Sequence, residues 1–285
     1  MKPAKFKYHA PKDLSEALSL VAESGDESKV LAGGQSLVPS MNFRLARPAV
    51  LIDINGVGGI DGIDASSGHL SIGALARHVT LERPVVEGPL GRLLATAAHN
   101  VGHLPIRVRG TFGGSLAHAD PAAEWCMIAS LLDATIVASS VRGQREIPAA
   151  DFFKTVFTTT LEPDEILTEV RLPRLGPGAE VGFVEFSRRA GDFAIVAAST
   201  VLEVADGRIS SARVALGGVG GTPLRSPAAE SVLTSNEPDD SLFEEAGAAA
   251  ARDVEPMGDI HGSAEYRRDL VRVLTRRALQ SSMKA

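Results

Sequence analysis

The chain has 285 residues, of which 44% are hydrophobic and 22% charged, and its formal net charge is −6. Its length exceeds the size at which chains usually divide into domains, and its composition is typical of a soluble globular protein. An acidic balance without a block of like charge disfavours a nucleic-acid or anionic-membrane surface, and no apolar stretch is long enough to cross a bilayer. The N-terminus lacks the apolar core of a signal peptide, so we expect a cytoplasmic location.

The first lobe is expected to begin with a well-marked helix. Asp13 can cap a helix starting at Leu14, Glu16 stands three residues later as in a capping box, and Gly25 ends the apolar helical spacing. Around this helix we expect strands at 30–32 and 50–54 and a short helix within 39–45. The glycine-rich segment 56–59 indicates a joint between two lobes.

The rest of the chain divides into a second lobe and a C-terminal part. In the second lobe the pattern predicts strands at 69–72, 134–138 and 165–172 and helices at 90–100 and 121–132. A Pro- and Gly-rich stretch, 173–178, then marks a boundary. Beyond it we expect strands at 193–204 and 209–216, joined by the hairpin signal Asp206-Gly207, and helices at 241–252 and 264–280. The last helix is rich in arginine, which is typical of a solvated face and also suits an acidic partner.

Two glycine pairs carry most of the functional information. The first lies in Ala32-Gly33-Gly34-Gln35-Ser36-Leu37 and the second in Thr111-Phe112-Gly113-Gly114-Ser115-Leu116. Successive backbone N–H groups without side chains form a concavity that fits an anion, so two such segments could hold a diphosphate between them. A bound dinucleotide is therefore predicted. It is not of the Rossmann type, because Asp61 stands where a fingerprint starting at Gly56 needs its third glycine, and no P-loop pattern occurs.

Cysteine content limits the redox chemistry that the chain can perform alone. Cys126 is the single cysteine, so an internal disulfide is excluded. Iron–sulfur clusters are normally held by four thiolates, so the chain cannot hold one by itself. Because Cys126 lies in the apolar run 125–129, we expect it to be a small core side chain.

The two glycine motifs, with the second extended to residue 124, resemble the two FAD signatures of one family. This family is the flavin-binding medium subunit of molybdenum hydroxylases, which includes aerobic carbon monoxide dehydrogenase, xanthine dehydrogenase and bacterial heteroaromatic dehydrogenases. The resemblance extends over essentially the whole chain, with further matching segments at 6–11, 106–111, 186–194 and 217–219. It implies an α+β fold with a two-lobed FAD-binding domain of the vanillyl-alcohol-oxidase type at 1–176 (lobes about 1–55 and 56–176). A C-terminal domain at 177–285, with a three-stranded antiparallel sheet and helices, is expected to follow.

The resemblance also implies a function in electron transfer. Electrons would pass from a molybdenum cofactor in a large subunit, through two-iron two-sulfur clusters in a small subunit, to FAD in this chain and then to an external acceptor. A dimer of heterotrimers is expected. Two other functions stay open: a self-sufficient flavin oxidase or dehydrogenase, and an FAD-binding assembly module without turnover.

Residue by residue, the resemblance assigns thirteen positions to FAD and none to catalysis or metal binding. These are Ala32, Gly33, Gly34, Gln35, Ser36, Leu37, Thr111, Gly113, Gly114, Ser115, Asp120, Glu124 and Leu167. Relatives often carry a lysine near Glu185, so no contact is assigned there. His99, His103, His118 and Asp120 could instead form a metal site, but the flavin loop explains the last two better.

Overall fold

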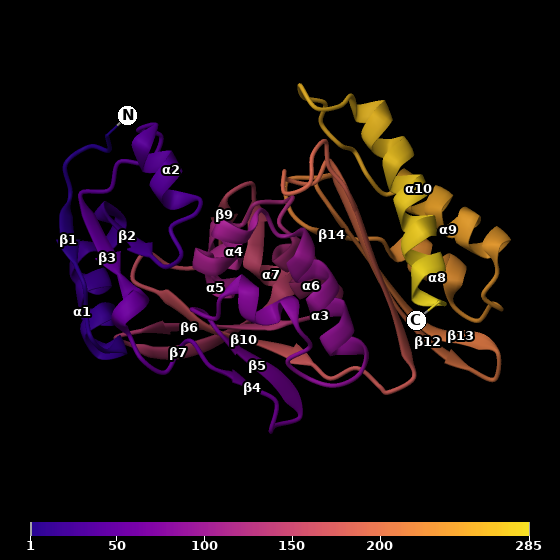
Figure 1. Ribbon diagram of the computed structural model, residues 1–285, viewed down its shortest axis with the longest axis horizontal. Coiled ribbons are helices and arrows are strands. Elements are labelled where there is room, and N and C mark those ends of the chain that lie inside the picture. The colour runs from indigo at the N-terminus through magenta and orange to yellow at the C-terminus, as the bar shows by residue number, and fades with distance from the viewer. Residues whose placement is uncertain (1, 285) are drawn as a thin grey trace.

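The computed structural model describes residues 2–284. They form two lobes and a C-terminal layer in chain order (Figure 1), which confirms the expected α+β class. The first lobe contains a parallel sheet of order β1-β3-β2. Its elements are β1 (Lys7–His9), α1 (Leu14–Ser24), β2 (Ser28–Leu31), α2 (Leu37–Asn42) and β3 (Val50–Asp53), with short 3-10 turns at Gly25–Glu27 and Ile54–Gly56.

Helix α1 begins and ends at the residues that the sequence indicates. The Asp13 carboxylate accepts a hydrogen bond from the Glu16 backbone N–H at 2.9 Å, and the Glu16 carboxylate accepts one from the Lys12 N–H at 2.9 Å. Gly25 ends the helix with φ +48°, a conformation that glycine adopts without strain. Ala17 and Val21 are buried against Ile52 of β3, which fixes the helix on the sheet.

The second lobe is built on a five-stranded antiparallel sheet of order β4-β5-β10-β6-β7. The strands are β4 (Ile63–Asp64), β5 (His69–Gly73), β6 (Thr135–Ser140), β7 (Gly143–Pro148) and β10 (Ile166–Pro173), with a small hairpin of β8 (Phe153–Thr155) and β9 (Thr158–Thr159). The helices are α3 (Pro89–Asn100), α4 (Leu104–Arg109), α5 (Phe112–His118), α6 (Glu124–Leu131) and α7 (Ala149–Phe152), with a 3-10 helix η3 (His78–Glu82).

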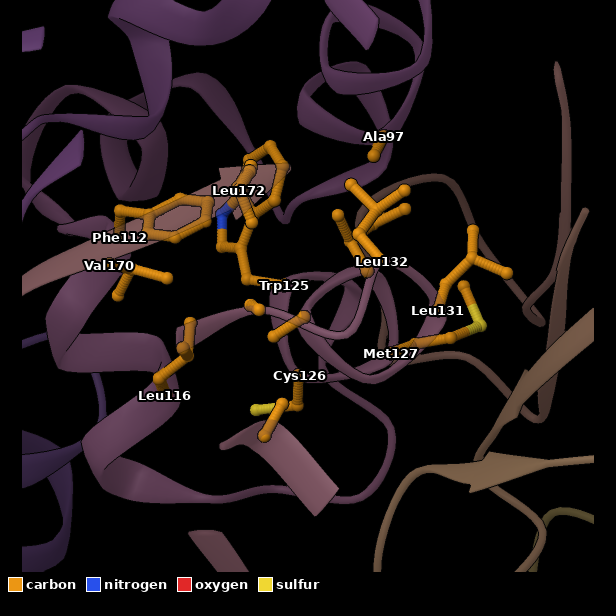
Figure 2. Close-up of a cluster of buried hydrophobic side chains, with 14 of the residues drawn as sticks. Ala97, Phe112, Leu116, Trp125, Cys126, Met127, Leu131, Leu132, Val170 and Leu172 are labelled. Carbon is orange, nitrogen blue, oxygen red and sulfur yellow. The ribbon is translucent and has the colours of Figure 1, made fainter. Parts of the chain in front are cut away.

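The core of the second lobe is centred on α6. Trp125, Cys126 and Met127 are fully buried, and Figure 2 shows them between Leu116, Leu131 and Leu132. The ring of Phe112 lies 4.9 Å from that of Trp125, centroid to centroid. The expectation that Cys126 is a core side chain is confirmed.

The C-terminal part is a sheet covered on both faces. Its order is β11-β12-β13-β14, from β11 (Ala179–Phe186), β12 (Val196–Ala205), β13 (Arg208–Gly217) and β14 (Leu224–Arg225). The sheet therefore has a fourth strand, the two-residue edge strand β14, in addition to the three strands that the resemblance implied. Along β12, Ala197 and Val201 face the second lobe, whereas Ala198 and Leu202 face the helices α8 (Pro227–Leu233), α9 (Asp240–Arg252) and α10 (Ala264–Ser282). These helices form the outer layer in Figure 1.

Candidate functional site

A cavity of about 630 Å³ is lined by segments from both lobes and by residues 191–193 of the C-terminal part. Its walls include the β2–α2 loop, the start of α5, the turn before α6 and the start of β10. Such a volume lies within the range of pockets that hold small molecules and cofactors. All thirteen residues that the sequence assigns to a dinucleotide lie on its walls: Ala32, Gly33, Gly34, Gln35, Ser36, Leu37, Thr111, Gly113, Gly114, Ser115, Asp120, Glu124 and Leu167.

The first glycine motif offers the free N–H groups that an anion site needs. Within residues 2–284, no oxygen accepts a hydrogen bond from the backbone N–H groups of residues 33–37. Gly34 adopts φ +71°, which turns the chain between β2 and α2. The Ser36 hydroxyl makes no capping hydrogen bond to α2. Five successive donors in the cavity wall are therefore left without a protein acceptor.

The second glycine motif differs from the expected anion-binding turn. Thr111 caps α5, and its hydroxyl accepts a hydrogen bond from the Gly114 N–H at 3.1 Å. The other N–H groups of this turn also have protein acceptors: Phe112 donates to Ala76 O, Gly113 to Ala74 O and Ser115 to Thr111 O. The prediction that both motifs present free N–H groups is wrong for this one, because the helix cap and the neighbouring strand use them.

Close packing explains why positions 33 and 113, where the two motifs meet neighbouring backbone, are glycines. A Cβ at Gly33 would lie 2.5 Å from Arg109 O and 2.6 Å from Gly110 Cα, and a Cβ at Gly113 would lie 2.6 Å from Ala74 Cα. These distances are shorter than any ordinary van der Waals contact. Absence of side chains thus lets the first motif rest directly on the backbone that precedes the second.

A polar bridge ties the same two segments together. The Asn55 side-chain amide donates to Ala32 O at 2.8 Å, and its carbonyl accepts from Arg77 Nη2 at 2.7 Å. The other terminal nitrogen of Arg77 donates to Arg109 O. The bridge joins the end of β2 to the segment before α5 and so fixes the distance between the cavity walls. Neither Asn55 nor Arg77 belongs to a recognisable motif, so sequence reasoning missed both.

Carboxyl groups lie close to one another at the C-terminal end of the second glycine motif, which extends to residue 124. The Asp120 carboxylate accepts a hydrogen bond from the Ala122 N–H at 2.9 Å, and this turn delays the predicted helix at 121–132 until Glu124. Burial, helped by the Asp120 charge, raises the pKa of Glu124 to about 7. Burial and then the Glu124 charge raise the pKa of Glu185 to about 9, and the buried Glu185 Oε2 atom has no hydrogen-bond partner among the residues that the structure describes. Glu185 does not line the cavity.

The aromatic side chains of His118, Phe157 and Phe193 line the cavity wall, and sequence reasoning linked only one of them, His118, to the flavin loop. Phe157 adopts φ +56°, and its ring stacks on that of His118 with a centroid distance of 4.8 Å. Both rings line the cavity, as does Phe193, which is 64% exposed. The left-handed backbone at a bulky residue is rare and draws attention to Phe157 only once the fold is known.

The histidines do not form a metal centre. Among residues 2–284, no group of three or more His, Cys, Asp or Glu side chains could hold a metal ion. His99 Nδ1 lies 2.7 Å from Ala95 O on its own helix, and the His103 ring lies beside Gly191. Burial lowers the pKa of His118, which therefore favours its neutral form.

The fold and the cavity define a two-lobed protein with a cavity whose wall offers backbone N–H donors suited to an oxygen-rich, anionic ligand. Comparison with known proteins agrees with this description. Residues 4–175 match the family described as the FAD binding domain in molybdopterin dehydrogenase, and residues 182–282 match the CO dehydrogenase flavoprotein C-terminal domain. The chain therefore belongs to the family of FAD-binding domains of molybdopterin dehydrogenases.

Individual relatives cover nearly the whole chain. It is 39% identical over 284 residues to the 6-hydroxypseudooxynicotine dehydrogenase complex subunit alpha of Paenarthrobacter nicotinovorans, with 99% of this chain and 96% of the relative covered. It is 40% identical over 280 residues to the nicotine 6-hydroxylase medium subunit of the same organism, with 98% of both covered. A solved structure of carbon monoxide dehydrogenase from Hydrogenophaga pseudoflava matches with a TM-score of 0.95 and 34% identity, covering 100% of this chain and 99% of that one.

These findings confirm the family resemblance together with the cofactor and the enzyme class that it implies. The chain is an FAD-binding medium subunit of the molybdenum-hydroxylase class, with FAD as its cofactor and oxidoreductase as its enzyme class. Among the helices within residues 2–284, none is both long and apolar enough to span a membrane.

Proposed function

We propose that this chain takes electrons from the iron–sulfur clusters of a small partner subunit and passes them, through FAD held in the cavity, to an external acceptor. The observation that carries the proposal is the gathering of all thirteen predicted residues on the walls of one cavity, where five of them offer N–H groups that have no acceptor within residues 2–284. A large subunit with the molybdenum cofactor, a dimer of heterotrimers and a cytoplasmic location belong to the same proposal.

The residues of the cavity fit a flavin dinucleotide. N–H groups of residues 33–37 would hold diphosphate oxygens, because they are donors without a protein acceptor at the end of a strand. The hydroxyl of Ser115 lines the cavity, and the carboxyls of Asp120 and Glu124 suit the hydroxyl donors of a sugar chain. Leu167 offers an apolar surface for a ring.

The bound flavin supplies the redox chemistry, and the protein supplies binding, orientation and electrostatics. The Asn55–Arg77 bridge holds the two walls at a fixed separation. The stacked rings of Phe157 and His118 form part of the cavity wall. We further propose that 1–176 (lobes about 1–55 and 56–176) forms the FAD-binding domain and 177–285 the C-terminal domain.

Purification of the chain alone tests the first half of the proposal. It should be yellow, contain FAD and lack iron and molybdenum, and it should not oxidise aldehydes, purines or carbon monoxide. Rapid flavin reduction by such a substrate in the isolated chain would favour the self-sufficient enzyme instead.

Reconstitution tests the second half. Adding the iron–sulfur and molybdenum subunits from the native source should make flavin reduction depend on the substrate of the complex. If FAD binds but a reduced partner never reduces it, the chain is an assembly module.

A further inference from the structure

His78 is a buried histidine on the wall of the cavity, and one of its ring nitrogens, Nδ1, already accepts a hydrogen bond. It begins η3, is 5% exposed and lines the cavity. Trp125 Nε1–H donates a hydrogen bond to His78 Nδ1 at 3.0 Å within the buried core. The direction of this bond is unambiguous, since an indole nitrogen is a donor only.

This hydrogen bond fixes the tautomer of the ring. A neutral imidazole that accepts at Nδ1 carries its proton on Nε2. Burial, and then the positive charges of Arg77 and Arg107, lower the pKa of His78 to about 4, so the ring is neutral at physiological pH. Within residues 2–284, no protein acceptor takes a hydrogen bond from Nε2.

The free donor lies beside the junction of the two glycine motifs. A Cβ at Gly110 would be 2.6 Å from both Cδ2 and Nε2 of His78, so this edge of the ring rests on a bare backbone. Gly110 is itself the residue against which Gly33 packs, and Gly33 opens the row of free N–H groups. An oxygen atom of a ligand in the cavity would give this donor the acceptor that the described residues do not supply.

We propose that His78 binds the flavin dinucleotide directly, donating a hydrogen bond from Nε2–H to one of its oxygen atoms, with Trp125 holding the ring in the required tautomer. This inference rests on the proposed function, since it needs FAD in the cavity. It adds a cofactor-binding residue that lies outside both glycine motifs. Trp125 has a positioning function in it, acting through His78.

Titration of FAD into the flavin-free full-length chain tests the inference. His78→Phe should raise the dissociation constant of FAD about tenfold, the loss expected for one hydrogen bond to a charged or strongly polar group. Trp125→Phe should give a smaller increase, because the ring can then adopt either tautomer. His99→Phe is the matched control: its side chain is exposed on α3 and lies outside the cavity, so affinity should stay unchanged.

Nitrogen-15 NMR of the histidine rings of the wild-type chain gives a second readout, which does not depend on whether a variant folds. The Nε2–H signal of His78 should shift when FAD is added. A shift with ADP assigns the acceptor to the diphosphate, and a shift with riboflavin assigns it to the ring or ribityl part. If FAD binds and this signal stays unmoved, or His78→Phe binds FAD as the wild type does, the inference fails alone. If the wild-type chain does not bind FAD at all, the proposed function fails.

Discussion

Replacing Gly33 with alanine should weaken FAD binding by preventing the two cavity walls from meeting. The new Cβ would lie 2.5 Å from Arg109 O and 2.6 Å from Gly110 Cα. Both are backbone atoms, which cannot rotate away as a side chain could. Overpacking of this kind costs about 1–3 kcal/mol. The flavin-free protein can relieve the strain by separating the walls, whereas the complex needs both walls in contact with the cofactor. The FAD dissociation constant should therefore rise roughly 5- to 150-fold.

The measurement is a fluorescence titration of the flavin-free chain with FAD, supported by thermal unfolding with and without the cofactor. Gly58→Ala serves as the control, since a Cβ there meets nothing within 4 Å and Gly58 has no positive φ. The control should bind FAD as the wild type does. Unchanged affinity in Gly33→Ala would refute the reasoning, because it would show that the two motifs do not need to touch.

Three further changes test other parts of the structure. Cys126→Ala should lower the free energy of unfolding by about 1–2 kcal/mol in urea titrations and leave flavin content unchanged, because a small core side chain is lost; loss of flavin would contradict this. Thr111→Val should lower the free energy of unfolding by about 1 kcal/mol in the same assay, because it removes the capping hydroxyl that accepts a hydrogen bond from the Gly114 N–H. In the flavin-bound wild type, the contribution of Glu185 to stability should fall as pH rises from about 4.5 toward 9, since the native pKa of Glu185 lies above its unfolded value and the fold favours the protonated acid. Glu185→Gln should flatten this pH dependence of the melting temperature; an identical slope would show that Glu185 is not the group responsible.

Local signals in the sequence predict those elements whose ends are set by neighbouring residues. The capping residue Asp13 and the stop at Gly25 both fall where α1 begins and ends. Asp206 and Gly207 join β12 to β13 with φ values of +52° and +75°, as a tight hairpin requires. In contrast, β7 escapes prediction because five of its six residues are exposed and only Ile147 is buried, which leaves no alternating apolar pattern.

The sequence predicted those parts of the candidate site that lie in continuous motifs. The segment 32–37 and the residues from Thr111 to Glu124 were found from their glycines and their order along the chain, and the fold brings them to one cavity. Contacts between distant residues could not be predicted. Trp125 and His78 are 47 residues apart, and the Asn55–Arg77 bridge links two lobes. Pairing of this kind depends on the tertiary structure and leaves no local pattern.

The two glycine pairs look alike in the sequence, yet their backbone N–H groups are used differently in the structure. In the first pair the glycines leave N–H groups free and permit a positive φ at Gly34. In the second, Gly113 and Gly114 sit in the first turn of a helix whose donors are all engaged, and they allow close approach to Ala74 and to the hydroxyl of the cap. A substitution in the first pair should therefore act on cofactor affinity, and one in the second mainly on the stability of α5. Gly114→Asp should still lose FAD, but through displacement of Thr111, since its Cβ would lie 2.6 Å from Thr111 Oγ1. A variant that keeps full flavin occupancy when purified would show that the start of α5 does not shape the cavity.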